Sequence, residues 1–378
     1  MEKKKIYWCI QQLSSIGGTE MVSINLMNKL VEYCDITIIS VAKIPSSIVY
    51  TIDNRINIES LNVDSSITRF DQYSLNYKHE HKYLKFISLA FQAFSTYTFK
   101  RSKYKRKIKN MVHDNILICS SLDNYFFAPK GITVYYHFHF NSLWFKNFIN
   151  RFALRLCRKP NKYIFLSSST QEDVCEMLKL DKSKTTYIYN PIRFASSLNL
   201  QNHNNTILFA GRFEYQKNPL LALEIASELK KGNLGFKLNM YGEGSLKPKM
   251  EEYILKNNLS ANVSLYPPLI DFEPVLSTSD ILLLPSRFEG FPLVKGEAMA
   301  FSCPTISSNW GKTIYEMLEE GKDGYIIDSL DPKDYAQKLI EYFSSKDDMK
   351  TMKQYSYNKS LALSYDAIIP LWKKLLGI

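Results

Sequence analysis

This chain of 378 residues has few cysteines and no long hydrophobic run. Its six cysteines are scattered and include no Cys-x-x-Cys pair, so neither a disulfide framework nor a zinc site is indicated. No run of about 18 uninterrupted apolar residues occurs, so the sequence predicts no transmembrane helix. The apolar segment Ile6–Ile10 is shorter than a usual signal-peptide core and favours a first strand. These absences favour a protein of a reducing compartment.

The excess positive charge lies entirely in the first half of the chain. Residues 1–190 contain 27 Lys/Arg and 15 Asp/Glu, whereas residues 191–378 contain 21 and 22. This difference predicts an anionic partner for the first half. The densest basic segment runs from residue 100 to residue 109, and its seven basic residues are Lys100, Arg101, Lys103, Lys105, Arg106, Lys107 and Lys109.

Aromatic segments lie on both sides of this basic segment. His81–Phe94 precedes it and Leu143–Lys159 follows it, and both mix aromatic and aliphatic residues with Lys or Arg. Such a mixture on a helix suits the headgroup region of an anionic membrane, so the basic segment is a candidate membrane or acceptor contact. The alternative is an ordinary solvated basic face. We expect no nucleic-acid partner, because no nucleic-acid-binding module is recognisable.

The hydrophobic pattern alternates between strands and helices, which predicts an α/β fold with doubly wound sheets. Gly17 and Gly18 open the first helix, and a phosphate can bind at such a turn. Asn190-Pro191 interrupts the alternation and marks a boundary between two domains. Strands are predicted at Ile6–Gln11, Ile36–Val41, Ile116–Cys119, Thr133–Tyr136, Lys162–Leu166, Thr206–Phe209, Lys237–Tyr241, Val263–Tyr266, Ile281–Leu284, Pro304–Ser307 and Gly324–Ile327, and helices at Thr19–Tyr33, Gln171–Leu178, Pro219–Lys230 and Tyr365–Leu376.

Two carboxylates, Glu289 and Glu297, flank a glycine loop in the second half. The apolar run Ile281–Leu284 before them is short enough for a buried strand, and Glu297–Ala300 favours a helix. Gly290 lets the backbone approach a ligand, and amides at the start of the helix can face an anion. Because carboxylates accept hydrogen bonds from vicinal hydroxyls, the arrangement suits a sugar nucleotide. From the spacing alone, the alternative is two solvated glutamates.

Several short segments resemble, in order, the motifs of one enzyme family. They are Ile16-Gly-Gly-Thr-Glu20, Ile188-Tyr-Asn-Pro-Ile192, Phe209-Ala-Gly-Arg-Phe213 with Gln216-Lys-Asn-Pro219, Tyr241-Gly-Glu-Gly244, and Glu289-Gly-Phe-Pro-Leu293 with Glu297-Ala-Met299. The chain thereby resembles retaining glycosyltransferase family 4, of the capsule and surface-polysaccharide type. The resemblance implies the GT-B fold, in which two Rossmann-like doubly wound domains face a central cleft.

The resemblance also implies a division of the chain. Residues 1–190 would form an acceptor-binding domain and residues 191–361 a nucleotide-sugar-binding domain, with a C-terminal helix at 362–378 packed back on the first. The partners implied are a nucleotide-sugar donor and a glycan or polyprenyl-linked acceptor. No cofactor is expected. A place in the cytoplasm, peripheral at the inner face of the cell membrane, follows from the acceptor and from the basic segment.

The catalytic residues implied by the resemblance are His137, Arg212, Lys217 and Glu289. Arg212 and Lys217 would neutralise the pyrophosphate that leaves the donor. The sequence contains no Asp-x-Asp pair, the metal-bridging signature of the other large glycosyltransferase fold, so we expect no catalytic metal. The alternative for Lys217 is a solvated side chain near a helix start.

The donor-binding residues implied by the resemblance form a larger set. Glu289 would hold hydroxyls of the donor sugar, Glu297 the ribose, and Leu269 the base through its backbone. Lys295 stands where relatives usually have an apolar residue, and the sequence offers no reason for it. The whole set is Gly17, Gly18, Arg212, Lys217, Leu269, Glu289, Gly290, Phe291, Leu293 and Glu297.

His137 and His139 follow the strand predicted at Thr133–Tyr136, where a doubly wound sheet binds ligands. The segment Tyr135-Tyr-His-Phe-His-Phe-Asn141 resembles a His-Phe-Asn-Phe motif of capsule-type relatives, which makes His137 the candidate near the reacting sugar. His139 takes that place if the alignment shifts by two. A structural core histidine is the other alternative. Metal binding is not expected, because no acidic or cysteine partner lies nearby in the sequence.

Taken together, the sequence predicts a retaining, metal-independent glycosyltransferase. It would move a hexose or N-acetylhexosamine from a UDP-sugar to a growing surface glycan. One alternative is a GT-B nucleotide-sugar hydrolase or epimerase. The other is a catalytically silent scaffold that binds glycans or membranes.

Overall fold

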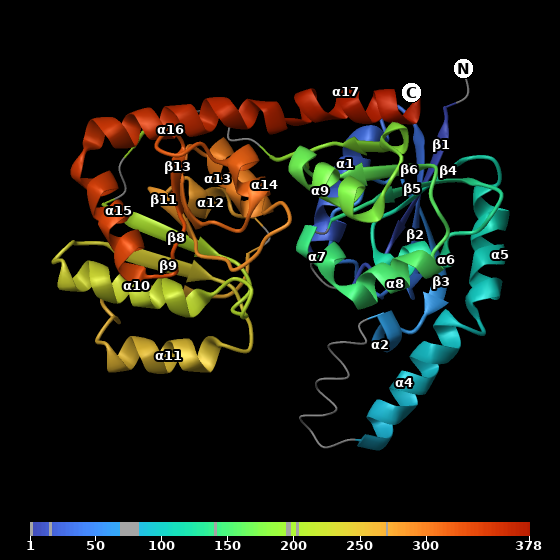
Figure 1. Cartoon of the computed structure of the whole chain (residues 1–378), viewed down its shortest axis with the longest axis horizontal. Helices are drawn as coiled ribbons and strands as arrows, with labels where there is room; N and C mark the ends of the chain where they lie inside the picture. The colour runs from blue at the N-terminus through green and yellow to red at the C-terminus, as the bar shows by residue number, and fades with distance from the viewer. Residues whose placement is uncertain are drawn as a thin grey trace. The chain divides into compact units, whose positions relative to one another are not determined.

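The computed structural model describes residues 3–14, 17–68, 83–139, 142–193, 198–201, 204–269 and 271–378. The chain divides into two compact units, the first formed by Met1–Tyr189 with Ile369–Ile378 and the second by Asn190–Ile368. Each unit is built on a parallel sheet with helices on its faces (Figure 1). The α/β, doubly wound class predicted from the sequence is confirmed.

The sheet of the first unit has seven strands within the described residues, in the order β3-β2-β1-β4-β5-β6-β7. Neighbouring strands run parallel. The chain builds outward from β1 to β3 and then crosses to β4 on the other side of β1. The strands are β1 Lys5–Ile10, β2 Asp35–Ala42, β3 Asn57–Val63, β4 Ile116–Cys119, β5 Thr133–His137, β6 Lys162–Phe165 and β7 Thr185–Tyr187.

The helices of the first unit cover this sheet and extend from it. Figure 1 shows α4 in cyan at the end of the unit where α2 lies, and the two helices are in contact. The helices are α1 Gly18–Leu30, α2 Ser65–Thr68, α4 Tyr83–Tyr97, α5 Arg101–Val112, α6 Leu122–Phe127, α7 Ser142–Lys146, α8 Phe148–Leu156 and α9 Ser168–Leu178, followed by a 3₁₀ turn at Lys182–Lys184.

The second unit repeats the architecture with six strands in its described residues, in the order β10-β9-β8-β11-β12-β13. The strands are β8 Thr206–Ala210, β9 Lys237–Tyr241, β10 Val263–Tyr266, β11 Ile281–Leu284, β12 Thr305–Ser308 and β13 Gly324–Ile327. Because the chain builds from β8 toward β10 and then returns to β11, the strand order reverses between β8 and β11. In such sheets ligands bind outside the carboxyl ends of the strands at this switch point.

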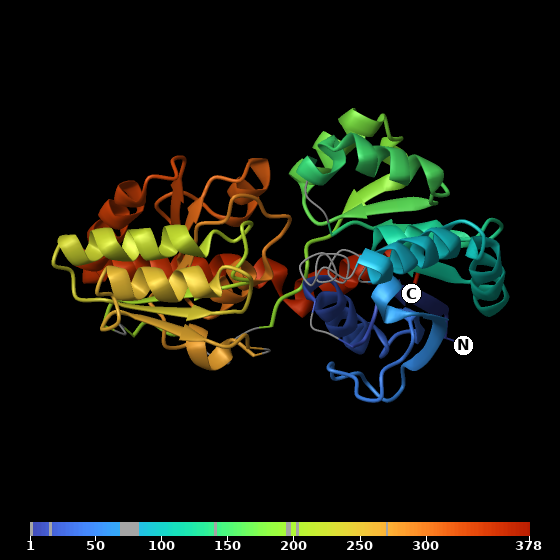
Figure 2. The same cartoon turned by 90° about the horizontal axis from the view of Figure 1, so that it is seen from below.

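Helices pack on both faces of the second sheet. Figure 2 shows α10 and α11 side by side, and Figure 1 shows them on the other side of β8 and β9 from α13. The helices are α10 Pro219–Lys231, α11 Lys247–Lys256, α12 Glu273–Leu276, α13 Leu293–Ala300, α14 Lys312–Met317, α15 Pro332–Ser344, α16 Lys346–Ser360, a 3₁₀ turn at Leu361–Leu363, and α17 Tyr365–Leu376. From Ile369 onward α17 belongs to the first unit.

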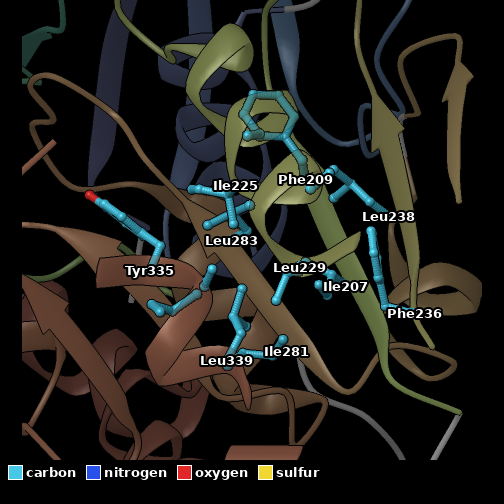
Figure 3. Packing of buried hydrophobic residues seen from close by; sticks show 14 of the residues in the cluster. Ile207, Phe209, Ile225, Leu229, Phe236, Leu238, Ile281, Leu283, Tyr335 and Leu339 are labelled. Atoms are coloured by element: carbon cyan, nitrogen blue, oxygen red, sulfur yellow. The ribbon is translucent and has the colours of Figure 1, made fainter. Parts of the chain in front are cut away.

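The core of the second unit lies between its sheet, α10 and α15. Figure 3 shows Ile207 and Phe209 of β8 beside Leu238 of β9, with Ile225 of α10 and Leu339 of α15 packed on them. All four residues of β11 are buried, which explains its uninterrupted apolar sequence. This rigid core fixes the ends of β8 and β11, from which the loops of the candidate site emerge.

Candidate active site

Lys217 and Glu289 meet beyond the carboxyl ends of β8 and β11. These strands are parallel neighbours, so the loops that follow them start at the same edge of the sheet. Lys217 Nζ lies 2.6 Å from Glu289 Oε1, and the side chains are only 15% and 6% exposed. A buried carboxylate needs a paired charge, and here the pair joins two segments 72 residues apart.

Gln216 and Arg287 connect the same two loops. The amide of Arg287 donates to the carbonyl of Gln216 at 2.8 Å, and Gln216 Nε2 donates to the carbonyl of Phe288 at 3.0 Å. The Arg287 guanidinium lies 4.5 Å from the centre of the Tyr215 ring. These contacts hold the loop of Lys217 against the loop of Glu289. The sequence motif around Gln216 contained this residue, but only the fold reveals its bridging role.

Arg212 occupies the rim of this arrangement. Its side chain is exposed, and Nη2 donates to Gln216 Oε1 at 2.9 Å. Gln216 therefore contacts Arg212 on one side and the Glu289 loop on the other. The structure brings Lys217 and Glu289 into direct contact and leaves the Arg212 guanidinium open to solvent, where an anion can reach it.

The glycine loop leads from Glu289 into α13. Gly290 and Phe291 precede Pro292, which is the N-cap residue of α13 and supplies no side-chain hydrogen bond. Leu293 is the first helical residue. Helix N-termini attract anions through their amides and the helix dipole. A site for a phosphate can therefore form at this end of α13, next to the buried Lys217–Glu289 pair.

Glu297 lies on α13, one helical turn beyond its start, and is half-buried. Burial, with a smaller contribution from Asp271, raises the pKa of its carboxyl to about 7, and Arg193 opposes this shift. Arg193 itself forms ion pairs with Asp271 at 3.1 Å and Glu273 at 2.9 Å. Leu269 precedes this group and is half-buried.

His137 and His139 form a pair in the first unit. His137 Nδ1 lies 3.1 Å from His139 Nε2. His137 is the last residue of β5 and is buried, so the prediction that it follows the strand was wrong by one residue. The reason is that β5 continues to pair with β6 through His137 and Ile164. His139 is half-buried, while Phe140 and Asn141 of the same motif lie outside the described residues.

The surroundings of His137 are aromatic. Its ring centre lies 6.2 Å from Trp8 of β1 and 5.2 Å from Trp372 of α17. Burial, followed by the neighbouring His139, lowers the pKa of His137 well below its usual value, and burial lowers the pKa of His139 to about 3. Both rings are therefore neutral near pH 7. Among the described residues, His137 Nε2 has no hydrogen-bond partner.

Gly17 and Gly18 lie at the start of α1 in the first unit. The Gly17 amide donates to Tyr50 Oη at 2.9 Å, and a Cβ atom on Gly17 would lie 2.5 Å from Glu20 Oε2. The Glu20 carboxylate therefore lies against Gly17, and this flexible side chain would have to move to admit a larger residue there. Ile16 of the same motif lies outside the described residues.

The basic segment forms the N-cap and most of α5. Lys100, Lys103, Arg106, Lys107 and Lys109 are exposed, whereas Arg101 and Lys105 are half-buried. Two of the seven residues contact backbone carbonyls: Arg101 donates to Phe126 at 2.8 Å and Leu156 at 2.9 Å, and Lys107 donates to Ser60 at 2.6 Å. Arg101 therefore joins the start of α5 to the ends of α6 and α8.

Apolar side chains are exposed on the two helices near this basic segment. The exposed fraction reaches 84% for Leu84 of α4 and 71% for Ile149 of α8. His81 and Lys82 of the aromatic segment before α5 lie outside the described residues. The exposed apolar residues of α4, α8 and the turn before α5 are Tyr83, Leu84, Ile87, Phe91, Phe94, Phe99, Phe148, Ile149, Phe152 and Leu156. Below, these ten residues are called the apolar face.

In the described part of the chain, no group of three or more His, Cys, Asp or Glu side chains is arranged to hold a metal ion. None of the helices in those ranges has both the length and the apolar character that crossing a membrane requires.

Known proteins with similar sequences and folds bear on this site. Residues 193–359 match the family described as "Glycosyl transferases group 1". This match includes Arg212, Lys217, Glu289 and Glu297. An uncharacterized glycosyltransferase of Haemophilus influenzae is 24% identical over 99% of this chain and 100% of its own length. These matches support a glycosyltransferase.

One further named relative and two solved structures align with nearly the whole chain. A Campylobacter jejuni alpha-1,4-N-acetyl-D-galactosaminyltransferase, whose name specifies a PP-undecaprenol-linked glycan, is 24% identical over 99% of this chain and 98% of its own. The crystal structure of a mutant of Staphylococcus aureus TarM in complex with fondaparinux, alpha-GlcNAc-glycerol and UDP aligns with a TM-score of 0.77 at 15% identity. The alignment covers 99% of this chain and 100% of the TarM chain. Anabaena HepE in complex with UDP aligns at 0.72 and 14% identity over 99% of both chains. The chain has the GT-B fold, as predicted.

Proposed function

We propose that this protein is a retaining glycosyltransferase of family 4 that transfers a hexose or N-acetylhexosamine from a UDP-sugar without a divalent metal. The acceptor is a surface glycan or a lipid-linked precursor of one. The observation that carries the proposal is the buried contact between Lys217 and Glu289 at the switch point of the second sheet. The TarM and HepE complexes with UDP, and the undecaprenol-linked name of the Campylobacter relative, support the donor and acceptor classes.

The charges at this edge suit the chemistry of a leaving nucleoside diphosphate. As the bond between the sugar and the pyrophosphate breaks, negative charge grows on the phosphate oxygen. Fixed cations stabilise that charge most in the transition state. Lys217 is held by Glu289 and Arg212 by Gln216, so both cations are oriented before the donor binds. The departing phosphate then accepts the proton of the attacking acceptor hydroxyl on the same face of the sugar, which retains the configuration.

Glu289 has two roles in this proposal. One oxygen pairs with Lys217, and the carboxylate accepts hydrogen bonds from hydroxyls of the donor sugar. The backbone amides of Gly290, Phe291 and Leu293 approach the phosphates of the donor. Glu297 accepts hydrogen bonds from the ribose hydroxyls. The backbone of Leu269 contacts the base. We also propose a donor-binding role for Gly17 and Gly18 of the first unit.

The histidine pair supplies the remaining proposed contact of the first unit. His137 is the residue that matches the family motif, while His139 is the more exposed ring of the two. We propose that the pair acts together near the reacting sugar, with neutral rings linked by the 3.1 Å contact. The residues 1–190 and 362–378 are proposed as the acceptor domain, and 191–361 as the donor domain.

We also propose that the protein attaches to the cytoplasmic face of an anionic membrane. The apolar face lies on α4 and α8, and Arg101 joins α8 to the start of the basic helix α5. Apolar side chains beside exposed lysines suit the headgroup region of a membrane. The apolar side chains enter the boundary of the acyl chains, and the lysines pair with anionic lipids. Such attachment would bring the enzyme to a lipid-linked acceptor.

A single experiment separates this proposal from its alternatives. The purified protein is incubated with a panel of UDP-sugars, with and without a membrane extract that contains acceptors, and released UDP is measured. We expect release that depends on the extract. Release of UDP without any acceptor would indicate a hydrolase, and conversion of the sugar without release of UDP would indicate an epimerase. Absence of turnover with retained glycan or membrane binding would indicate a silent scaffold.

A further inference from the structure

Lys295 and Asp323 form an ion pair that is completely buried in the second unit. Lys295 Nζ lies 3.0 Å from Asp323 Oδ2, and both side chains are 0% exposed. Lys295 is the third residue of α13, whereas Asp323 immediately precedes β13. Burying both charges is expensive, which calls for a reason beyond packing.

The pair extends into a network that reaches α16. The other oxygen of Asp323, Oδ1, accepts a hydrogen bond from the amide of Glu319 at 2.6 Å. Lys359 of α16 lies 3.7 Å from Asp323 and 3.4 Å from Glu319, and Tyr355 of the same helix donates to Glu319 at 2.8 Å. Helix α13 also packs directly against α16. The short helix is therefore anchored, through Lys295, to a much longer one.

The position of this anchor within the sequence links it to the candidate site. Lys295 lies between Glu289 and Glu297, and α13 has only eight residues. Its N-cap, Pro292, makes no side-chain hydrogen bond that could fix the start of the helix. A further contact, the close approach of Gly296 to Ile192, leaves no room for a Cβ atom, which would lie 2.8 Å from Ile192 Cγ2. Lys295 and this glycine contact therefore constrain the orientation of α13, together with its packing against α16.

We propose that Lys295 is a positioning residue for donor binding. Its ion pair with Asp323 sets the orientation of α13, and thereby the position of Glu297 and of the amides at the start of the helix. The two charged groups constrain each other's position, because moving one away would leave the other charge buried without a partner. The inference rests on the proposed function, because the nucleotide is the ligand that this orientation serves.

The chain offers a closely matched control pair. Lys353 and Asp280 are 2% and 0% exposed, and Lys353 Nζ lies 2.9 Å from Asp280 Oδ1. As in the first pair, the other aspartate oxygen accepts a backbone amide, here that of Thr206 at 3.0 Å. Asp280 precedes β11 as Asp323 precedes β13, so both aspartates lie at the amino ends of their strands. The two pairs have similar burial and bonding, but only the first includes a residue of α13, the helix that carries Glu297.

The test compares Lys295→Met/Asp323→Asn with Lys353→Met/Asp280→Asn. Each double variant removes two buried charges. In each, the Asn side chain keeps an oxygen that can accept the hydrogen bond from the backbone N–H. We expect similar losses of thermal stability in the two, but a rise of about tenfold or more in the Kd for UDP only in the first. For a nucleotide sugar, KM should rise more than kcat falls. Parent-like UDP affinity in the Lys295 double variant, or equal losses in both, would overturn the inference.

Two further measurements keep the result interpretable. If the first double variant does not fold, Lys295→Arg is used, because it keeps the charge but changes the length and shape of the pair. We expect a folded protein with weakened UDP binding, and parent-like binding would again contradict the inference.

UDP binding by the parent protein is measured first. A parent that binds no nucleotide contradicts the proposed function itself, whereas parent binding that is insensitive to Lys295 contradicts only this inference.

Discussion

Lys217 and Glu289 form a contact of 2.6 Å between loops that follow two adjacent parallel strands. In this mostly buried position each side chain supplies an opposite charge to the other. A substitution of either residue therefore changes both the donor contacts and the electrostatic environment of the partner.

The first prediction concerns Glu289→Gln. We expect turnover to fall by at least about tenfold while the affinity for free UDP changes less, because the carboxylate contacts the sugar and not the nucleotide. Loss of the charged partner of Lys217 should also lower the free energy of unfolding by about 1–3 kcal/mol. Steady-state kinetics, UDP titration and urea unfolding measure the three effects. Glu341→Gln is the control, since Glu341 pairs with Lys338 at 2.8 Å on the exposed face of α15.

The control should leave all three quantities nearly unchanged, because exposed ion pairs contribute little to stability. Parent-like turnover in Glu289→Gln would remove the residue from the proposed sugar contact.

The second prediction concerns the two cations and the absence of a metal requirement. Arg212→Met and Lys217→Met should each lower turnover by roughly 100-fold, as removal of preorganised electrostatic groups does. Arg212 is exposed and Lys217 is paired with Glu289, so only Lys217→Met should also destabilise the fold. Lys231→Met, on the exposed end of α10, is the control. Addition of a chelator should leave the parent rate nearly unchanged, and a rate abolished by chelator and restored by Mn²⁺ would refute the mechanism.

The third prediction is a pH dependence that arises from Glu297. Its pKa in the folded protein is about 7, above the ordinary value of 4.5, so the protonated carboxyl is the favoured form in the folded state. The raised pKa of Glu297 contributes to the free energy of unfolding below pH 4.5. This contribution is lost as the pH rises through about 7, because the carboxyl of the folded protein then ionises. In the absence of ligand, Glu297→Gln should therefore be more stable than the parent above pH 7, and the difference should shrink toward pH 4.5.

UDP binding should show the opposite trend in the parent. The ionised carboxylate is the better acceptor for ribose hydroxyls, so the affinity should rise with pH through about 7, by up to tenfold per pH unit. The phosphates of UDP titrate as well, but their contribution persists in Glu297→Gln and can be subtracted. Identical pH profiles of the two proteins, measured by calorimetry, would exclude this role for Glu297.

Much of the fold could be predicted because buried strands have a direct signature in the sequence. The strands at Ile116–Cys119 and Ile281–Leu284 were predicted at their observed limits, since all their residues are apolar and buried. The strand β3 at Asn57–Val63 was missed. It lies at the edge of its sheet and contains polar residues, so no apolar run announces it.

The contacts within the site could not be predicted in the same way. The motifs identified Lys217 and Glu289 as separate candidates, but their direct contact depends on the pairing of β8 with β11. Lys295 had no explanation until the fold placed Asp323, 28 residues away, beside it. The burial of His137 likewise follows from β5 continuing one residue further than its β-branched and aromatic pattern suggested. In each case the missing information is a long-range contact that the local sequence does not encode.

The last prediction concerns attachment to membranes through the first unit. Two sets of variants test it: charge reversal at Lys100, Lys103 and Arg106, and Phe91→Ser with Ile149→Ser on the apolar face. Arg101 and Lys107 are left intact because their side chains donate hydrogen bonds to backbone carbonyls. A loss of membrane binding in the charge-reversed variant then does not result from disruption of the fold. Leu255→Ser is the control for the apolar set, since Leu255 is 71% exposed on α11 in the second unit.

We expect the parent to sediment with vesicles that contain anionic lipid and to be partly released by raised salt, because screening weakens the attraction between lysines and lipid headgroups. The charge-reversed variant should lose most of this binding. The variants of the apolar face should lose the part of the binding that raised salt does not remove, because burial of the apolar side chains of the parent contributes a hydrophobic term. The Leu255→Ser control should bind like the parent. All variants should retain activity on a short soluble acceptor, since the substitutions lie outside the proposed donor site. Equal binding to neutral and anionic vesicles, or binding that neither set of variants changes, would identify the basic segment as an ordinary solvated surface.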